Sequence, residues 1–322
     1  MRSKALLVGV VVLALPACGD VADGADGEDR ELEYNGIRLN GIRLNGIRLN
    51  GIRLNGSLLG DEGTGDVIEM SAFNLPTAAV AVSAWLEGSE LKVLTDGGVV
   101  LGGADLEKTR LDFSIKETGK HKKKQVRISK VQRLAPGSDV WLYDLDLKDG
   151  GGPWESLCVT SQGQATQAIL LADAWSPATG ARVAEEEGVV TFACRDAALG
   201  KCVEWGYWPW ALDGDVPLRE YHQACTRLVR ADYCGDAISH TVDGTPVHVV
   251  DPLGIQLVDP FAEYVVEAEW GPEGATCVNP DNLRLGPLTL ECELPLCGGD
   301  SFSSGGIVQS GKVVNAAQLQ SP

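Results

Sequence analysis

The side chains with the greatest chemical capacity gather in residues 231–251, which read ADYCGDAISHTVDGTPVHVVD. Cys234 could act as a thiol nucleophile if His222 or His240 served as its base. A nucleophilic cysteine must stay unpaired, whereas the eight cysteines other than Cys18 form an even set that can pair completely in an exported protein. We therefore expect Cys234 to form a disulfide, and we predict no catalytic residue.

The same stretch offers four candidate metal ligands, which are His240, Asp243, His248 and Asp251. Zinc requires three or four such groups to converge on one point. If residues 247–250 form a strand, His248 lies on the face opposite Val247 and Val249, and nothing obliges His240 to meet it. We therefore predict no metal site and no cofactor.

Three carboxylates close to aromatic residues raise the alternative of glycoside chemistry: Glu204, Asp232 and Glu269. Hydrolysis of a glycosidic bond needs two acids that face one cleft, and the sequence does not place these three together. The sequence contains no phosphate-binding loop, no GxSxG elbow and no dinucleotide fingerprint. An extracytoplasmic hydrolase acting on polysaccharide or another envelope polymer is the alternative function.

Aromatic residues are concentrated in the segment WGYWPW, which supplies Trp205, Tyr207, Trp208 and Trp210. If exposed, such a cluster could stack on sugar rings or hold a partner protein. If buried, it would form the core of a small disulfide-bonded domain, and we expect this for most of the four. Pro209 separates two of the tryptophans, so at least one could be exposed, and the four are our candidate ligand-binding residues.

Residues 1–17 predict a lipoprotein signal peptide. Arg2 and Lys4 precede an apolar run that is too short to span a bilayer permanently and that ends in Leu-Pro-Ala-Cys. This lipobox-like ending predicts lipidation of Cys18 and anchoring through acyl chains. The alternative is an ordinary secretory signal cleaved nearby, and both interpretations export the chain. Gly19, not Asp, follows the cysteine, which favours the outer membrane of the cell envelope.

The net charge of −18 argues against nucleic acid as a partner, because phosphate backbones bind basic surfaces. The remaining cysteines predict up to four disulfides and all lie after residue 157: Cys158, Cys194, Cys202, Cys225, Cys234, Cys277, Cys292 and Cys297. We expect Cys194 to pair with Cys202 and Cys292 with Cys297, because each pair could close a short loop.

Before residue 62 the chain predicts an acidic tether at 18–34 and a repeat at 35–61. The repeat unit is Ile-Arg-Leu-Asn-Gly, which resembles the pentapeptide repeats of square β-solenoids. In such a coil Leu39, Leu44, Leu49 and Leu54 would point inward, with Asn-Gly pairs at the corners. The alternative is a low-complexity spacer.

The rest of the chain predicts an α+β fold that is mostly β. Residues 62–149 form a β-rich region of alternating strands and Gly-rich turns, and residues 150–297 form a Cys-rich domain. Its one main helix covers about 217–231, with Asp215 as the N-cap. One face of this helix carries Leu218, Tyr221, Cys225, Leu228 and Val229. We expect residues 298–322 to be a flexible tail.

Four blocks of the sequence occur in a characteristic order: CVEWGYWPW, HQACTRLVRADYCGD, HTVDGTPVHVVDPLGIQ and EAEWGPEGATCVN. Together they resemble the ADYC domain, which is named for the tetrapeptide at residues 231–234. The resemblance covers about 150–290, and the NGxxLNG-type repeats add 35–56. It implies a lipoprotein of the myxobacterial type and carries no catalytic role with it.

These features predict a cell-envelope lipoprotein that acts as a binding or structural surface module. Its expected partners are a membrane, through the N-terminal lipid, and an envelope polysaccharide or protein. Within the ADYC tetrapeptide we expect Ala231 and Asp232 to end the helix, Tyr233 to pack in the core and Cys234 to form a disulfide.

Overall fold

A computed structural model describes residues 68–314, apart from 118–119, 161, 173, 177–178, 184–189, 196, 243, 258–263, 300–301 and 303. The predicted signal peptide, the lipidation site Cys18, the tether and the pentapeptide-like repeat therefore lie outside the described residues.

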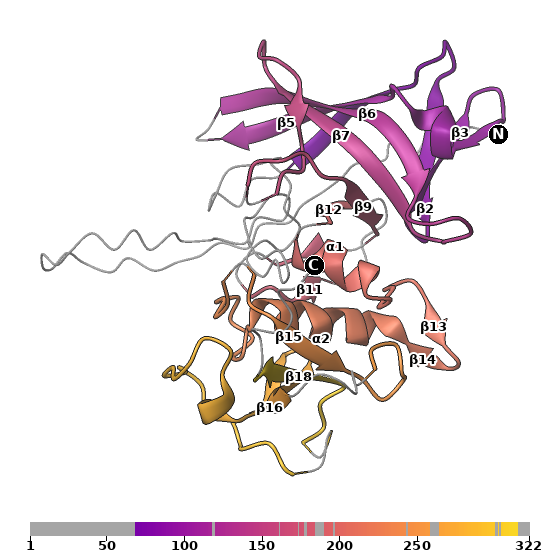
Figure 1. Ribbon diagram of the computed structural model, residues 1–322. Coiled ribbons are helices and arrows are strands. Elements are labelled where there is room, and N and C mark those ends of the chain that lie inside the picture. The colour runs from indigo at the N-terminus through magenta and orange to yellow at the C-terminus, as the bar shows by residue number, and fades with distance from the viewer. Residues whose placement is uncertain are drawn as a thin grey trace, which may run out of the picture.

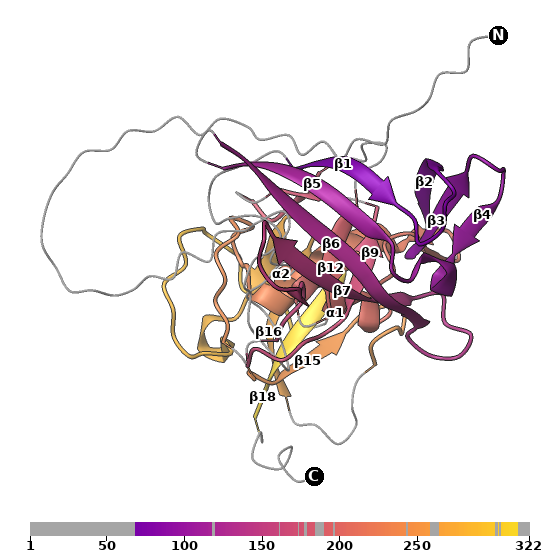
Figure 2. The same cartoon turned by 90° about the horizontal axis from the view of Figure 1, so that it is seen from above.

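The described part of the chain is mostly β, with two α-helices and several antiparallel sheets, which confirms the predicted fold class. Figure 1 shows the largest sheet at one end of the molecule, a four-stranded sheet at the other end, and both helices between them. Seen from above, the long strands of the largest sheet lie across the helices (Figure 2).

The largest described sheet has seven strands, with the order β1-β5-β6-β7-β9-β12 and β8 paired to β7. Their bounds are β1 (Ile68–Asn74), β5 (Arg110–Glu117), β6 (Lys120–Arg133), β7 (Trp141–Asp149), β8 (Glu155–Ser156), β9 (Ala168–Leu171) and β12 (Thr191–Cys194). The sheet curls strongly. The curl brings Phe113 of β5 into edge-to-face contact with Phe192 of β12, with ring centroids 6.5 Å apart. Its concave face encloses a core that contains Val126, Leu145 and Leu170.

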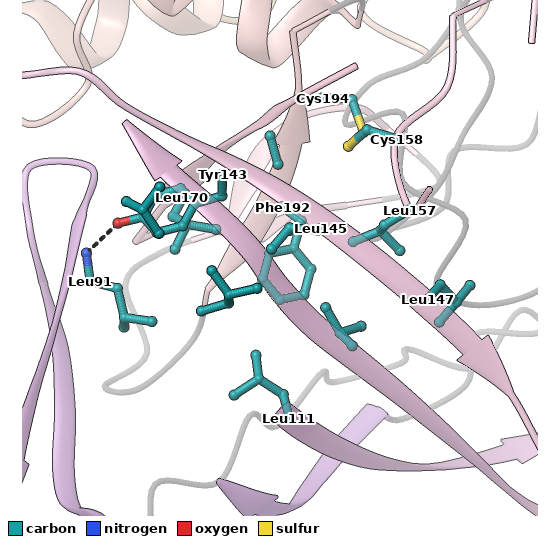
Figure 3. Close-up of a cluster of buried hydrophobic side chains, with 14 of the residues drawn as sticks. Leu91, Leu111, Tyr143, Leu145, Leu147, Leu157, Cys158, Leu170, Phe192 and Cys194 are labelled. Atoms are coloured by element: carbon teal, nitrogen blue, oxygen red, sulfur yellow. Dashed lines mark hydrogen bonds between the residues drawn. A yellow bond between two sulfur atoms is a disulfide. The ribbon is translucent and has the colours of Figure 1, made fainter. Parts of the chain in front are cut away.

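A three-stranded sheet covers one end of this core. It comprises β2 (Ala81–Glu87), β3 (Glu90–Thr95) and β4 (Val100–Gly102), followed by the 3₁₀ turn η1 (Gly103–Leu106). Alternation along β3 sends Leu91 and Val93 into the core. The buried hydroxyl of Tyr143 accepts a 2.8 Å hydrogen bond from the Leu91 amide, which ties the small sheet to β7 (Figure 3).

The two α-helices form the middle layer. Helix α1 (Ala198–Glu204) packs Leu199 and Val203 against the β9–β12 end of the large sheet. Helix α2 (Leu218–Arg230) agrees closely with the predicted helix, and its predicted apolar face is buried. The prediction that Asp215 caps α2 is wrong. A tight hairpin of β13 (Leu212–Asp213) and β14 (Val216–Pro217) reaches the helix directly, so Pro217 is the N-cap residue, without a side-chain hydrogen bond.

The four-stranded sheet packs against α2 and has the order β15-β18-β16-β17. Its strands are β15 (Val247–Val250), β16 (Tyr264–Gly271), β17 (Gly274–Val278) and β18 (Val308–Val313), and the short elements β10 (Ala174–Trp175), β11 (Arg182–Val183) and η2 (Pro280–Asn282) complete the fold.

Strand β18 corrects the prediction of a flexible tail over 298–322. Residues 308–313 form an inner strand that pairs with both β15 and β16. The strand reads VQSGKV, and its small polar residues and Gly-rich flanks lack the apolar alternation that predicts a strand. Ser310 is fully buried and accepts a hydrogen bond from the Trp270 indole, so packing with distant residues creates this strand.

Four disulfides lie in the C-terminal part of the described chain. The pairs are Cys158–Cys194, Cys202–Cys225, Cys234–Cys292 and Cys277–Cys297. The expected pairs Cys194–Cys202 and Cys292–Cys297 are wrong. Cys202 on α1 faces Cys225 on α2, so helix packing, rather than short sequence separation, selects the partners.

The predicted boundary between residues 149 and 150 falls inside the large sheet, because β7 lies before it and β9 after it. Neither helix in the described ranges has the length and apolar character needed to cross a membrane.

Candidate functional site

The ADYC tetrapeptide closes helix α2. Ala231 adopts the left-handed conformation with φ 51°, and the Asp232 amide donates a 2.9 Å hydrogen bond back to the Arg227 carbonyl oxygen. The Asp232 carboxylate is fully buried and lies 2.5 Å from Arg227 Nη1 and 3.6 Å from Arg230 Nη1. These contacts tie the helix end to its own last turn, so Asp232 has a structural role.

Tyr233 reaches a second buried ion pair. Its hydroxyl donates a 2.7 Å hydrogen bond to Glu267 Oε1, and the guanidinium of Arg284 lies 2.6 Å from Glu267 Oε2. Burial by itself would raise the pKa of Glu267. The charge of Arg284 and hydrogen bonds from Arg284, Tyr233 and Ser310 outweigh burial and hold that pKa below its ordinary value.

Cys234 cannot act as a nucleophile in this structure, because it is bonded to Cys292. The backbone conformation at the next position requires glycine. Gly235 has φ 70°, and a Cβ there would lie 1.8 Å from the carbonyl oxygen of Glu273. The ADYC segment thus joins α2 to the turn between β16 and β17.

The candidate metal ligands do not share a site. His248 stacks on Tyr264 with ring centroids 4.1 Å apart, whereas His240 lies beside Tyr233, where burial lowers its pKa. Asp251 accepts a 2.8 Å hydrogen bond from Tyr207 and further bonds from the amides of the following loop. Asp243 lies outside the described residues, and among those described no three His, Cys, Asp or Glu side chains gather around one point.

The three carboxylates considered for glycoside chemistry occupy separate environments. Glu204 forms a 2.5 Å ion pair with Arg195, and Asp232 lies in the buried arginine cluster described above. Glu269 is fully buried and accepts a 3.1 Å hydrogen bond from the Ser304 amide. They are therefore not a catalytic pair.

The aromatic segment is divided between core and surface. Tyr207 is fully buried, while Trp205, Trp208 and Trp210 are half-buried. The rings of Trp208 and Trp210 stack with centroids 6.3 Å apart, and the indole of Trp208 donates to the Val203 carbonyl oxygen. Ligand binding by these three tryptophans stays a prediction.

A groove of about 390 Å³ opens on the convex face of the large sheet, beside β7. Its lining residues are Asp144, Leu145, Asp146, Ser156, Ala165, Thr166, Gln167 and Arg195. Alternation along β7 sends Leu142, Asp144 and Asp146 to this face, and Val140, just before the strand, packs with Leu142. Val140 and Leu142 are covered by the layer that contains α1, so the groove begins where that layer ends.

Hydrogen bonds link the side chains on one side of the groove into a chain. Arg195 Nε donates to Glu204 Oε1 at 2.5 Å, and Arg195 Nη1 donates to Gln167 Oε1 at 3.1 Å. Gln167 Nε2 in turn donates to Asp144 Oδ2 at 3.4 Å. The chain fixes the orientation of the Gln167 amide, because its oxygen faces Arg195 and its nitrogen faces Asp144.

The other side of the groove is held by a second group. Asp146 accepts from Arg127 Nη2 at 2.5 Å and also from the hydroxyl of Ser129. The guanidinium of Arg127 lies over the half-buried ring of Trp154, 4.6 Å from its centroid. Asp146 therefore has a fixed position, with an aromatic ring beside its partner.

The disulfide Cys158–Cys194 borders both the core and the groove, next to Leu157 in Figure 3. Ser156 precedes Cys158 by two residues, and Arg195 directly follows Cys194. The Thr166 amide also donates a 2.9 Å hydrogen bond to the Cys158 carbonyl oxygen. The disulfide thus joins the two segments that supply most of the groove outside β7.

Residues 103–284, more than half of the chain, match the family model of the ADYC domain. The chain belongs to the ADYC domain family. The match starts well before residue 150, so this ADYC domain includes β5, β6 and β7 as well as the Cys-rich region. Comparison with curated proteins and with solved structures finds no match.

Sequence reasoning missed the groove of this ADYC protein, although one signal was present. The alternation in DVWLYDLDL places Asp144 and Asp146 on one face of a strand, opposite Leu145. Gln167 and Arg195 lie more than 20 residues further along the chain. The pairing of β9 with β7 and of β12 with β9 brings them there, and no local pattern reports that long-range pairing.

Proposed function

We propose that this ADYC protein is an exported binding module of the cell envelope, and that the groove beside β7 holds its ligand. The observation that carries this proposal is the prearranged polar lining. Because Gln167, Arg195 and Asp146 are already held by neighbours, a ligand would lose little free energy in ordering them. A concave site with a few convergent polar groups is typical of ligand-binding sites.

Location supports the same function. Four disulfides are typical of proteins outside the cytoplasm, where thiols are oxidised. Lipidation of Cys18 and anchoring in the outer membrane are the part of the proposal that rests on the sequence of the N-terminus alone. The acidic tether and the repeat would then separate the groove from the membrane.

A second candidate function is hydrolysis of an envelope polysaccharide. Asp144 and Asp146 both line the groove and lie two residues apart on one strand, so their Cα atoms are separated by about 6.6 Å. Both side chains therefore lie on the same face of β7, and hydrolysis of a glycosidic bond needs two acids that face one cleft. We favour binding, because Asp146 is already paired with Arg127 and Ser129 and so is committed to a structural contact.

Replacing one groove carboxylate tests the proposal. We expect Asp144→Ala to weaken retention of the purified chain on isolated cell envelopes by at least about tenfold, because a charged hydrogen-bond acceptor is lost from the lining. The measurement is a cosedimentation titration of the full chain with Cys18 replaced by Ser, so that the acyl chains do not contribute.

The matched control is Asp139→Ala, which removes the same charge from an exposed site in the loop between β6 and β7. It should bind as the parent chain does. Equal retention of the Asp144→Ala and Asp139→Ala variants would refute the groove as the binding site. Release of new reducing ends from the envelopes by the parent chain, and not by the Asp144→Ala variant, would favour the hydrolase.

A further inference from the structure

We infer that the ligand of this groove is an uncharged, polyhydroxylated chain, that is, a segment of neutral polysaccharide. The inference rests on the proposed binding function and adds the chemical class of the ligand. It follows from the charge balance of the groove, from its mixture of donors and acceptors, and from the polar nature of its lining.

Two of the three charged side chains that line the groove are held in ion pairs. Asp146 is neutralised by Arg127 at 2.5 Å, and Arg195 is neutralised by Glu204 at 2.5 Å. The remaining carboxylate, Asp144, lies on β7 directly opposite Lys130 of β6, and directly paired residues share one face of a sheet.

This balance argues against charged ligands. A phosphate or a uronic acid would approach the carboxylate of Asp144, and it could pair with Arg195 only by displacing Glu204. A cationic ligand could pair with Asp146 only by displacing Arg127. A neutral ligand need not displace either ion pair, even though the whole chain carries a net charge of −18.

The lining suits hydroxyl groups in particular. Carboxylates only accept hydrogen bonds and guanidinium groups only donate them, whereas a sugar hydroxyl does both. Neighbouring hydroxyls of one sugar ring can therefore donate to Asp144 and accept from Arg195, and the hydroxyl of Thr166, also in the lining, can do either. Trp154, beside Arg127, offers an apolar ring surface next to these polar groups.

A peptide ligand fits less well. Apolar side chains of a bound peptide need apolar pockets, and the apolar members of this lining are Leu145, which is buried, and Ala165. The sheet edge that a peptide strand could extend is not part of the lining, because β7 is paired to β6 on one side and to β8 and β9 on the other.

Selective chemical treatment of isolated envelopes tests the ligand class. Periodate cleaves vicinal diols, so pretreatment of envelopes with periodate should reduce groove-dependent retention by at least about tenfold. Groove-dependent retention is the difference between the full chain and its Asp144→Ala variant. Protease pretreatment should leave it unchanged. Raising NaCl from about 0.05 M to about 0.5 M should change it less than about twofold, because screening acts only on charged partners.

The outcomes separate this inference from the proposed function. Groove-dependent retention that survives periodate, or that is lost after protease treatment or in high salt, would show a different ligand in the same groove. The binding function would then stand and the neutral polysaccharide would be ruled out. Absence of any difference between the parent chain and the Asp144→Ala variant would instead remove the proposed function itself.

Discussion

The buried carboxylate of Glu267 links α2 to the four-stranded sheet. Its carboxylate is fully buried and is bound by Arg284, Tyr233 and Ser310, which lie on different segments of the chain. Arg284 also donates to the Leu228 carbonyl oxygen near the end of α2. The pair therefore connects the helix, both inner strands of the four-stranded sheet and the segment after η2.

Replacing Glu267 should be costly. We expect Glu267→Gln to lower the free energy of unfolding by about 3–5 kcal/mol, because the Arg284 guanidinium would stay buried without its counter-charge. Urea unfolding followed by tryptophan fluorescence measures this. Glu293→Gln, at an exposed position, is the control and should change the value by less than about 0.5 kcal/mol. A loss below about 1 kcal/mol for Glu267→Gln would contradict this role.

The same residue predicts a pH dependence. The folded-state pKa of Glu267 lies below the ordinary value of 4.5, so its contribution to stability is complete above that pH. The contribution is lost as the pH falls further, through the folded pKa. The urea midpoint of the parent chain should therefore decline below pH 4.5, and the Glu267→Gln variant should show a shallower decline. Parallel curves for the two chains would contradict the assignment.

At the scale of elements, the Cys158–Cys194 disulfide positions the groove. We expect the double variant Cys158→Ser, Cys194→Ser to lose about 4 kcal/mol of stability, since the bridge closes a loop between residues 36 apart in sequence. Envelope retention should fall as well, because Ser156 and Arg195 lose their covalent link. Removing Cys277–Cys297 in the same way is the control. It should lower stability without changing retention, and equal effects on retention would exclude a positioning role.

Strand β18 is the element on which the four-stranded sheet depends. Because it pairs with both β15 and β16, we expect truncation after residue 299 to abolish cooperative folding of the region that contains α2. Truncation after residue 314 keeps every strand of this sheet and is the control. Thermal unfolding followed by circular dichroism compares the two, and an unchanged transition after the first truncation would contradict the inner position of β18.

At the scale of the whole molecule, local patterns predicted local structure. The spacing of Leu218, Tyr221 and Cys225 predicted α2, and the Gly-rich turns of residues 62–149 predicted a β-rich region, which includes the hairpin of β3 and β4. Pairing across long sequence separations was not predictable. The partner of Cys202 depends on how α1 packs on α2, and β18 becomes a strand only beside β15 and β16.

For the candidate site, too, local features were predictable and long-range contacts were not. The composition predicted an acidic, exported, disulfide-bonded chain, and the ADYC tetrapeptide correctly pointed to scaffold contacts. The groove needs the curled sheet, the end of the α1 layer and the Cys158–Cys194 link at once. Because each of these is a tertiary feature, the residues Gln167 and Arg195 carried no local signal.

Footprinting tests the central claim most directly, because it compares the two aromatic surfaces in one experiment. The full chain is oxidised with hydroxyl radicals, with and without solubilised envelope polysaccharide, and side-chain oxidation is mapped by mass spectrometry. The groove predicts protection of Trp154 and of the peptide that carries residues 156–167, with Trp208 and Trp210 unchanged. Protection of Trp208 and Trp210 with no change at Trp154 would contradict it and place the ligand on the aromatic segment.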